Sequence, residues 1–305
     1  MCILCEYEEK GIEIPGTVNL VIAGCPRIRK IPNIPRLQQL ICIRCDNLKK
    51  IYPIQTLESL TCSNNTRLKK LPVFPNLRDL DCSKCPIRTI PILEKLEMLT
   101  CNECPRLVEI PEIDTLVYVH CVKSILLERI LSWRALQNLA CWDCRSLEAI
   151  PNASLVKLYC QNCPLITVIP DNPHFVEISC AWCVRLTAIC PSLSRLRFLR
   201  RLEALYCTAL IYIPLVPENC RLNLYGSPNI LQGRISGIDE VMNTLFLEEN
   251  VSAFHPDLRG IIHGYAGDDF RFEEEDKKEE MRMGKSKKKS SKSPKNHKNF
   301  SHKSR

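Results

Sequence analysis

Cysteines three positions apart are the residues of this chain whose type and spacing could do chemistry. The 305-residue sequence holds 20 cysteines, and many form Cys-x-x-Cys pairs with the spacing of zinc ligands. Consecutive pairs also follow one another at the spacing of a four-cysteine zinc site. Thiols from adjacent strands could converge in one set, Cys82, Cys85, Cys101 and Cys104. One interpretation of the sequence is therefore a body stabilised by zinc.

Thiol catalysis is a second chemistry to weigh. His120 stands directly before Cys121, and Cys141 opens a Cys-x-Asp triplet that ends at Asp143. Neighbours on a β-strand face opposite sides, so His120 and Cys121 cannot form a catalytic dyad. Cys141 falls at a position that the repeat described below predicts to be buried. We therefore expect a protein that is not an enzyme and needs no cofactor.

The cysteines recur with a period of about 20 residues, which marks a repeat protein. The first cysteine of the unit Leu-x-Cys-x-x-Cys-x-x-Leu-x-x-Ile is found at Cys42, Cys62, Cys82, Cys101, Cys121, Cys141, Cys160, Cys180 and Cys207. The second is found at Cys25, Cys45, Cys85, Cys104, Cys144, Cys163 and Cys183. Asn65 and Ser124 replace the second cysteine while the leucine frame persists. A structural zinc site would not survive losing a thiolate, so we predict packed cysteines and no metal site.

Each unit predicts one β-strand. Because side chains alternate along a strand, Leu99 and Cys101 point to one face while Met98 and Thr100 point to the other. The Leu99 position is apolar in every unit and holds Leu40, Leu60, Leu80, Val119, Leu139, Leu158, Ile178 and Leu205. Most units close with Ile-Pro or Leu-Pro, and proline excludes an interior helix from the return segment. Seven extra residues between Cys180 and Cys207 predict a short helical turn or bulge around residues 192–201.

On these residues the chain resembles the leucine-rich-repeat family, whose consensus is Leu-x-x-Leu-x-Leu-x-x-Asn/Cys-x-Leu. The resemblance implies an α/β solenoid, a leucine-rich-repeat horseshoe with a parallel β-sheet on its concave side and a mostly extended or 3₁₀ convex side. It also implies that the second-cysteine position donates a hydrogen bond to backbone carbonyls, which Asn, Ser or a thiol can do. The cysteine enrichment is similar to leucine-rich-repeat proteins of giant DNA viruses, and the Pro-rich units resemble bacterial type III effectors in repeat style only.

The concave face is where we predict a binding function. Its outward positions in the central and later units are predicted to collect Tyr118, His120, Trp142, Tyr159, Trp182 and Tyr206. Aromatic anchors within a charged surround are typical of protein-binding patches. In the alternative interpretation, Trp142 and Trp182 merely cover the edge of the core. The function that follows is a non-catalytic scaffold that binds a partner protein, acting on a host protein if the viral resemblance holds.

Basic residues gather in two places. Along the turn side of the first units, Lys49, Lys50, Lys69 and Lys70 predict a ridge that could bind an anion, or else a solvated flank that keeps the solenoid soluble. Residues 282–305 hold ten Lys or Arg and no acid, so residues 1–281 carry a net charge of −2 although the whole chain carries +8. Nucleic acid is therefore expected to bind through the tail alone. The alternative function is a zinc-stabilised repeat body whose basic tail directs it to nucleic acid or to the nucleus.

Four segments follow from these patterns. We expect a cap or degenerate repeat over residues 1–11, the solenoid over 12–230, a C-terminal cap over 231–270 and a disordered, Lys-rich tail over 271–305. The N-terminus has no stretch like a signal peptide, and 18 consecutive apolar residues occur nowhere. We therefore expect no membrane contact and a cytoplasmic location, in a host cell if the protein is viral, with a nuclear location as the alternative that the tail suggests.

Overall fold

The computed structural model describes residues 4–6, 17–131 and 134–232. They belong to the first of two compact units, Met1–Ile235, and the second unit, Ser236–Arg305, lies outside the described residues. The predicted C-terminal cap and tail, and most of the predicted N-terminal cap, therefore lie outside them too. Within the described ranges, no helix is long and apolar enough to cross a membrane.

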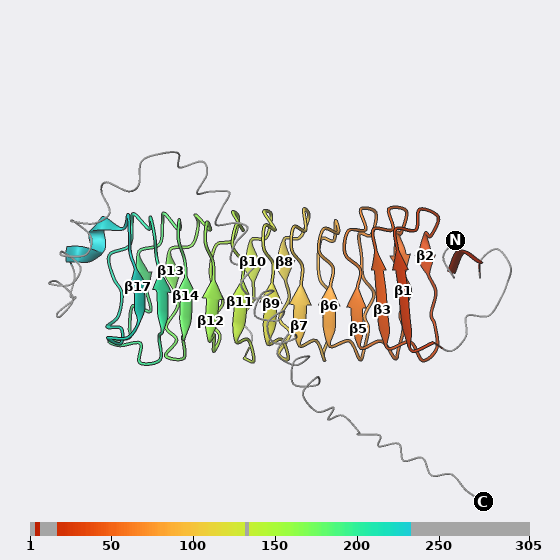
Figure 1. Ribbon diagram of the computed structural model, residues 1–305, viewed down its shortest axis with the longest axis horizontal. Helices are drawn as coiled ribbons and strands as arrows, with labels where there is room; N and C mark the ends of the chain where they lie inside the picture. Colours follow the sequence, from red (N-terminus) through yellow and green to blue (C-terminus); the bar gives the residue numbers. More distant parts are fainter. Residues whose placement is uncertain (1–3, 7–16, 132–133, 233–305) are drawn as a thin grey trace, which may run out of the picture. The chain divides into compact units, whose positions relative to one another are not determined.

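The described residues form a β-solenoid built on one parallel sheet of 11 strands (Figure 1). Its strands, in spatial order, are β1 (Asn19–Ala23), β3 (Gln39–Ile43), β5 (Ser59–Thr61), β6 (Asp79–Asp81), β7 (Met98–Thr100), β9 (Tyr118–His120), β11 (Asn138–Ala140), β12 (Lys157–Tyr159), β14 (Glu177–Ser179), β16 (Arg201–Glu203) and β17 (Arg221–Asn223). The spatial order is the order along the chain, so each unit hydrogen-bonds to the next. The predicted repeat fold is confirmed.

The return segments carry short strands of their own and almost no helix. They form three two-stranded parallel sheets, β2 (Lys30–Ile31) with β4 (Lys50–Ile51), β8 (Glu109–Ile110) with β10 (Arg129–Ile130), and β13 (Val168–Ile169) with β15 (Ala188–Ile189). A 3₁₀ helix, η1 (Pro228–Gln232), follows the last strand. This extended return side is what the unit-closing prolines predict.

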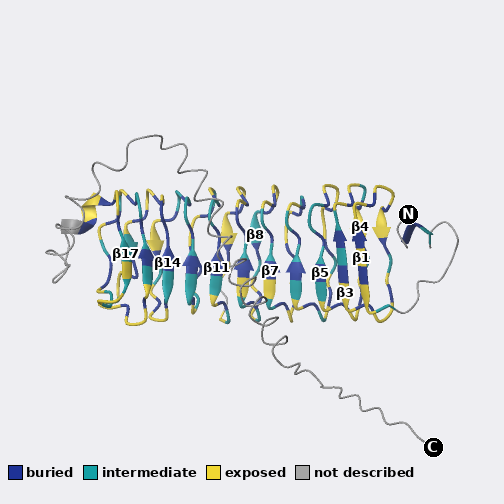
Figure 2. Ribbon diagram, viewed as in Figure 1, coloured by how far each residue is buried: buried dark blue, intermediate teal, exposed yellow. Residues whose placement is uncertain are grey.

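Alternating burial holds the sheet against the core. The central residue of each three-residue strand of the main sheet from β5 to β16, such as Leu60, Leu80 or Leu99, is at most 1% exposed, while at least one of its two neighbours remains partly accessible. Figure 2 shows the same alternation of buried and accessible segments around each unit. Stacked in register, these side chains and the first cysteines of the units form one continuous apolar column.

The second-cysteine position forms a ladder of hydrogen bonds inside this core. The thiols of Cys85, Cys144 and Cys163 donate to the carbonyls of Cys62, Cys121 and Cys141, one unit earlier, at 3.0, 2.9 and 3.1 Å. The Nδ2 atom of Asn65 and the hydroxyl of Ser124 donate in the same way, at 2.7 and 2.8 Å. The hydrogen bond that the family resemblance implied is present.

The register of the last units differs from the one predicted. Ile178 pairs with Leu202 rather than Leu205, so Leu202 fills the apolar position and Leu205 is only half-buried. Cys207 is therefore a second cysteine, whose thiol donates to the carbonyl of Cys180 at 3.0 Å. The insertion has four residues rather than seven, because 24 residues separate paired positions here. It forms turns and an isolated bridge between Arg195 and Leu215, not a helix.

Every unit turns sharply just before its second-cysteine position. The residue there has a positive φ of 52° to 74° in all 11 described units, at Gly24, Arg44, Asn64, Lys84, Glu103, Lys123, Asp143, Asn162, Trp182, Tyr206 and Gly226. This left-handed conformation is uncommon for residues other than glycine. We call these positions the left-handed column.

Candidate protein-binding face

The outward side chains of the main sheet form the candidate site, which we call the sheet face. Tyr118 and His120 occupy the two outward positions of β9, and Tyr159 occupies the second outward position of β12. Trp142 lies two residues beyond Ala140 in β11 and continues the same alternation. Four of the six predicted residues thus lie on three consecutive strands of one sheet.

The other two predicted residues lie elsewhere in the unit. Trp182 and Tyr206 belong to the left-handed column, in the turn beyond β14 and β16, and not at outward positions of strands. For Tyr206 the reason is the shift of register, which aligns it with Trp182. Trp182 itself precedes the insertion and has the same position in its unit as Asp143 and Asn162, one residue later than Trp142 in its unit. The Trp182 and Tyr206 rings stack at a centroid distance of 4.2 Å and an interplanar angle of 20°. The prediction that six residues share one set of outward positions is therefore wrong for this pair.

A glycine makes room for this stack. A Cβ atom at Gly226 would lie 2.5 Å from the Cδ1 atom of Tyr206, far inside van der Waals contact. The Tyr206 ring therefore lies directly over the backbone of the next unit and meets Tyr225 edge-on at 5.4 Å. Trp182 and Tyr225 remain 40% and 45% exposed, so the stack has accessible surface on both of its outer members. Burial raises the pKa of the Tyr206 phenol, which keeps it neutral.

Hydrogen bonds and ion pairs hold the side chains between these aromatics. The hydroxyl of Tyr159 donates to Glu177 Oε2 at 2.5 Å, and Lys157 lies 3.4 Å from the other oxygen of that carboxylate. One strand further, Ser179 and Arg201 donate to the two oxygens of Glu203 at 3.0 and 2.7 Å. Both carboxylates thus bridge two strands, and the sheet face is ordered before any partner arrives.

Trp142 is held by a cation. The Lys123 ammonium lies 5.2 Å from the Trp142 ring centroid, within the range of a cation–π contact. Trp142 is nevertheless partly exposed, so part of its side chain is accessible to solvent.

Sequence reasoning missed two exposed residues of this surface. Met98 pairs with Tyr118 across β7 and β9, and both side chains are 44% exposed. Alternation along the strand places Met98 outward, but an isolated methionine gave no reason to single it out as a binding residue. Tyr225 was missed because it aligns with Trp142 only in the corrected register.

The four cysteines of the zinc alternative do not form a metal site. Cys82, Cys85, Cys101 and Cys104 are fully buried, and the thiols of Cys85 and Cys104 donate to backbone carbonyls. Across the described ranges, no three or more His, Cys, Asp or Glu side chains gather as metal ligands would. Burial raises the pKa of the Cys101 thiol well above its ordinary value, which opposes the thiolate form that zinc needs.

The positions considered for catalysis are separated by the sheet. His120 is partly accessible on the sheet face, while Cys121 is fully buried beneath it, as alternation requires. Cys141 is also fully buried. Neither thiol is positioned as an accessible nucleophile.

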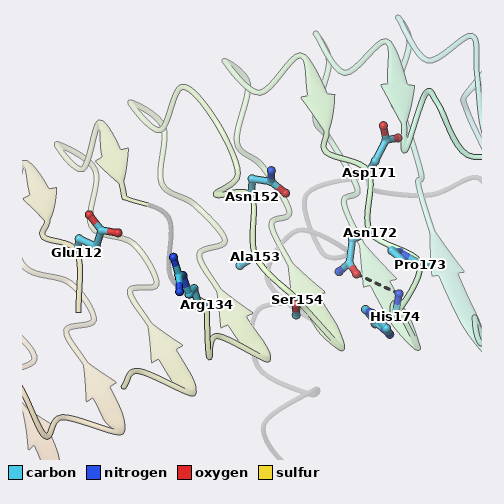
Figure 3. A pocket seen from close by; sticks show the side chains of 9 residues that line it. All are labelled: Glu112, Arg134, Asn152, Ala153, Ser154, Asp171, Asn172, Pro173 and His174. Atoms are coloured by element: carbon cyan, nitrogen blue, oxygen red, sulfur yellow. Dashed lines mark hydrogen bonds between the residues drawn. The ribbon is translucent and has the colours of Figure 1, made fainter. Parts of the chain in front are cut away.

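A hollow of about 410 Å³ opens on the return side (Figure 3). Elsewhere a large apolar side chain such as Phe74 or Ile113 fills the second position after the unit-closing proline, but here Ala153 and Asn172 occupy it. The hollow is lined by Glu112, Arg134, Asn152, Ala153, Ser154, Asp171, Asn172, Pro173 and His174. Figure 3 shows Asp171 pointing away from Asn172 and His174, so these side chains do not converge on one point.

The four lysines of the predicted anion-binding ridge are all exposed. Lys49 and Lys50 lie at the start of β4, and Lys69 and Lys70 lie at the same place in the next unit. Lys50 lies 4.2 Å from the Tyr52 ring centroid. The ridge predicted from the sequence thus presents its charges to solvent.

Comparison with known proteins adds little to this geometry. No protein-family model matches the chain, and no curated protein does. Among solved structures, the chain is similar to a leucine-rich repeat protein from Bacteroides ovatus, with 14% identity over 70% of this chain and 85% of that one and a TM-score of 0.32. The description of the chain as a leucine-rich-repeat-like solenoid therefore rests on its own register and hydrogen bonds.

Proposed function

We propose that this protein is a non-catalytic scaffold that binds a partner protein through the sheet face and the turns beside it. The observation that carries the proposal is the run of aromatic side chains across consecutive units from β9 to β16. We call Tyr118, His120, Trp142, Tyr159, Trp182 and Tyr206 the aromatic tract. Aromatic side chains bring a large contact area with few rotatable bonds, which is why they dominate the energetics of protein interfaces.

The surround of the tract supports the same proposal. The surround contains both signs of charge, and its side chains are already paired: Lys157 with Glu177 of the next strand, and Arg201 with Glu203 of its own strand. These side chains are already ordered, so a partner that contacts this polar rim loses less conformational entropy on binding. The cysteine-rich units resemble those of giant DNA viruses, so a host protein from amoebae is the partner that we would seek first.

The test is a comparison of captured proteins. The full chain, reduced throughout, would be used to capture partners from amoebal lysate, beside the triple variant Trp142→Ala, Tyr159→Ala, Trp182→Ala. We expect the triple variant to lose at least one protein that the native chain captures reproducibly, because hot-spot truncations each cost about 2 kcal/mol or more.

A matched control separates this effect from general loss of apolar surface. Val73, Ile92 and Phe198 are 57–61% exposed and lie off the sheet face, so the variant Val73→Ala, Ile92→Ala, Phe198→Ala should capture the same proteins as the native chain. Thermal unfolding of both variants checks that each remains folded. An identical set of captured proteins from all three chains would show that the aromatic tract is not a recognition site.

A further inference from the structure

Positive charge is concentrated in the first four described units. Residues 17–91 hold 13 Lys or Arg and four Asp or Glu, a net charge of +9, whereas residues 92–232 hold 13 of each. The small net charge of residues 1–281 conceals this division. One end of the solenoid is therefore strongly basic without any contribution from the Lys-rich tail.

Nine of these cations share one side of the solenoid, which we call the basic flank. It consists of Arg27, Arg29, Lys30, Lys49, Lys50, Arg67, Lys69, Lys70 and Arg88. Lys30 pairs directly with Lys50 in the sheet of β2 and β4, and the backbone N–H of Lys49 donates to the Arg29 carbonyl at 2.9 Å. Three of the four units have a pair of adjacent cations, and the fourth has Arg88 alone. The residues on either side of each pair are buried, such as Leu48 and Ile51, so every pair faces outward.

The adjacent cations of this flank stop before the fifth unit, which keeps one exposed cation at an equivalent position, Arg106. The positions of the adjacent cations hold Val108 and Glu109, then Glu128 and Arg129, linked by the hydrogen bond from the Glu128 N–H to the Val108 carbonyl. Arg129 is neutralised by Glu109, whose carboxylate lies 2.7 Å away. By contrast, no residue within the described ranges forms an ion pair with Lys49, Lys69 or Lys70. Two lysines of later described units also lack an ion pair, but Lys95 donates to the Asn76 side-chain oxygen and Lys123 lies over the Trp142 ring.

We propose that the basic flank binds the phosphodiester backbone of a double-stranded nucleic acid. Two cations per unit, with units about 4.8 Å apart, give about one positive charge per 2.4 Å along the flank. A duplex carries about one negative charge per 1.7 Å of its axis, a comparable linear density. Lysines exposed in this way act as point charges that replace condensed counterions, without reading the base sequence.

Other anionic partners fit the flank less well. A protein partner needs apolar or aromatic anchors at the centre of the interface, and the exposed positions of the flank are charged, with Tyr52 covered by Lys50. Single strands are held by aromatic side chains on which bases stack, and the aromatic tract lies in later units. The flank offers charge at regular spacing and little else, which is what a duplex backbone requires.

The experiment measures binding of the full chain to a fluorescent 30-base-pair DNA duplex as the salt concentration is raised. The flank variant is Lys49→Gln, Lys50→Gln, Lys69→Gln, Lys70→Gln, and the matched control is Lys95→Gln, Arg145→Gln, Arg185→Gln, Arg197→Gln, four exposed cations of later units. A third chain neutralises the tail at Lys285, Lys287, Lys288 and Lys289. Circular dichroism confirms that each chain is folded.

We expect the flank variant to lose tenfold or more in affinity near 0.1 M salt, and the slope of log K against log salt to become shallower by up to about 3.6. The control should lose much less, and the tail variant should keep the part of the slope that the flank supplies. Equal losses in flank variant and control, or binding abolished by the tail variant alone, would overturn the proposal. Tighter binding of polyglutamate or single-stranded RNA, with the same dependence on the flank, would also overturn it and assign the flank to that partner class.

Discussion

At the scale of single residues, the second-cysteine position decides how well each unit is joined to its neighbours. Asn65 makes three buried hydrogen bonds there, donating to the carbonyls of Cys42 and Cys62 and accepting from the N–H of Cys45. Asn65→Leu leaves those three backbone groups without partners, so we expect a loss of about 3 kcal/mol or more in the free energy of unfolding, measured in urea. Asn65→Ser keeps one hydroxyl, as Ser124 does naturally, and should lose clearly less. Equal losses in the two variants would contradict this account.

The buried thiols predict a dependence of stability on pH. Burial raises the pKa of Cys190 to about 11 from an ordinary value of 9.0, and burial also raises the pKa of Cys42 and Cys101. Between pH 9 and 11 the folded chain therefore holds protons that the unfolded chain has released, so stability is full below pH 9 and falls as the pH rises.

Urea unfolding under reducing conditions at pH 8, 9 and 10 measures this loss. Each thiol that stays protonated steepens the decline by up to about 1.4 kcal/mol per pH unit. The variant Cys190→Ala should decline less steeply than the native chain by one such contribution. A native chain whose stability is flat from pH 8 to 10 would contradict the prediction.

The left-handed column marks a limit of prediction from sequence at this scale. Glycine, asparagine and aspartate signal positive φ at Gly24, Asn64 or Asp143, but Lys84, Glu103 and Trp182 adopt it with no such signal. Hydrogen bonds between units impose the conformation there, such as the one from the Lys84 N–H to the Asn102 carbonyl at 2.8 Å. The period predicts the turn, whereas the backbone conformation depends on contacts with the next unit.

At the scale of elements, the position of the stacked Trp182 and Tyr206 rings depends on the turn beyond β17, which contains Gly226. Gly226→Ala must adopt a φ of +74° and place its Cβ against the Tyr206 ring, whereas Gly24→Ala must adopt a φ of +62° with no atom within 4 Å of its Cβ. We expect Gly24→Ala to lose about 1–2 kcal/mol from the left-handed conformation alone. Gly226→Ala should lose more and should change the near-ultraviolet circular dichroism of the Trp182–Tyr206 stack. An unchanged aromatic signal would show that the stack does not rest on this glycine.

The register of β16 offers a second test at this scale. Leu202 is fully buried in the apolar position and Leu205 is only half-buried, the reverse of what the cysteine spacing predicts. Leu202→Ala should therefore lose about 2–5 kcal/mol of unfolding free energy, and Leu205→Ala should lose markedly less. The opposite ranking in chemical unfolding would restore the register predicted from the sequence.

The reason for that wrong prediction is physical. Only Leu205 has the pattern Leu-x-Cys, which matches Cys207 to the first cysteine, whereas Leu202 is followed by Ala204 at that position and makes Cys207 the second cysteine. Once an insertion breaks the period, a single buried cysteine does not decide between these two registers. In the structure, Leu202 fills the apolar position. Ser227 then donates to the Ala204 carbonyl and accepts from the Cys207 N–H, so the hydrogen-bond ladder continues in this register. Where the period is unbroken, from β3 to β14, the sequence places every strand in its observed order.

At the scale of the whole solenoid, the two proposed surfaces occupy different units. The basic flank lies in the units of β1 to β6, on the return side, and the aromatic tract lies in the units of β9 to β16, on or beside the sheet face. Their variants can therefore be tested independently, since distant sites in a repeat array affect stability nearly additively. The sequence period alone indicated both the basic flank and the aromatic tract, because equivalent positions of successive units lie side by side in a solenoid.

The same architecture predicts that damage stays local. Each strand pairs only with its two neighbours, so a cavity made by Leu99→Ala in β7 removes packing from the units of β6, β7 and β9 while the hydrogen bonds of distant units are untouched. In native-state hydrogen exchange read by mass spectrometry, we expect faster exchange in those three units and unchanged exchange in β1, β3 and β17, because stability in a solenoid is a sum of unit and nearest-neighbour contributions. Uniformly faster exchange across all 11 strands would mean that the solenoid unfolds as one cooperative body, and the independence of its two surfaces would then have to be measured for each pair of variants.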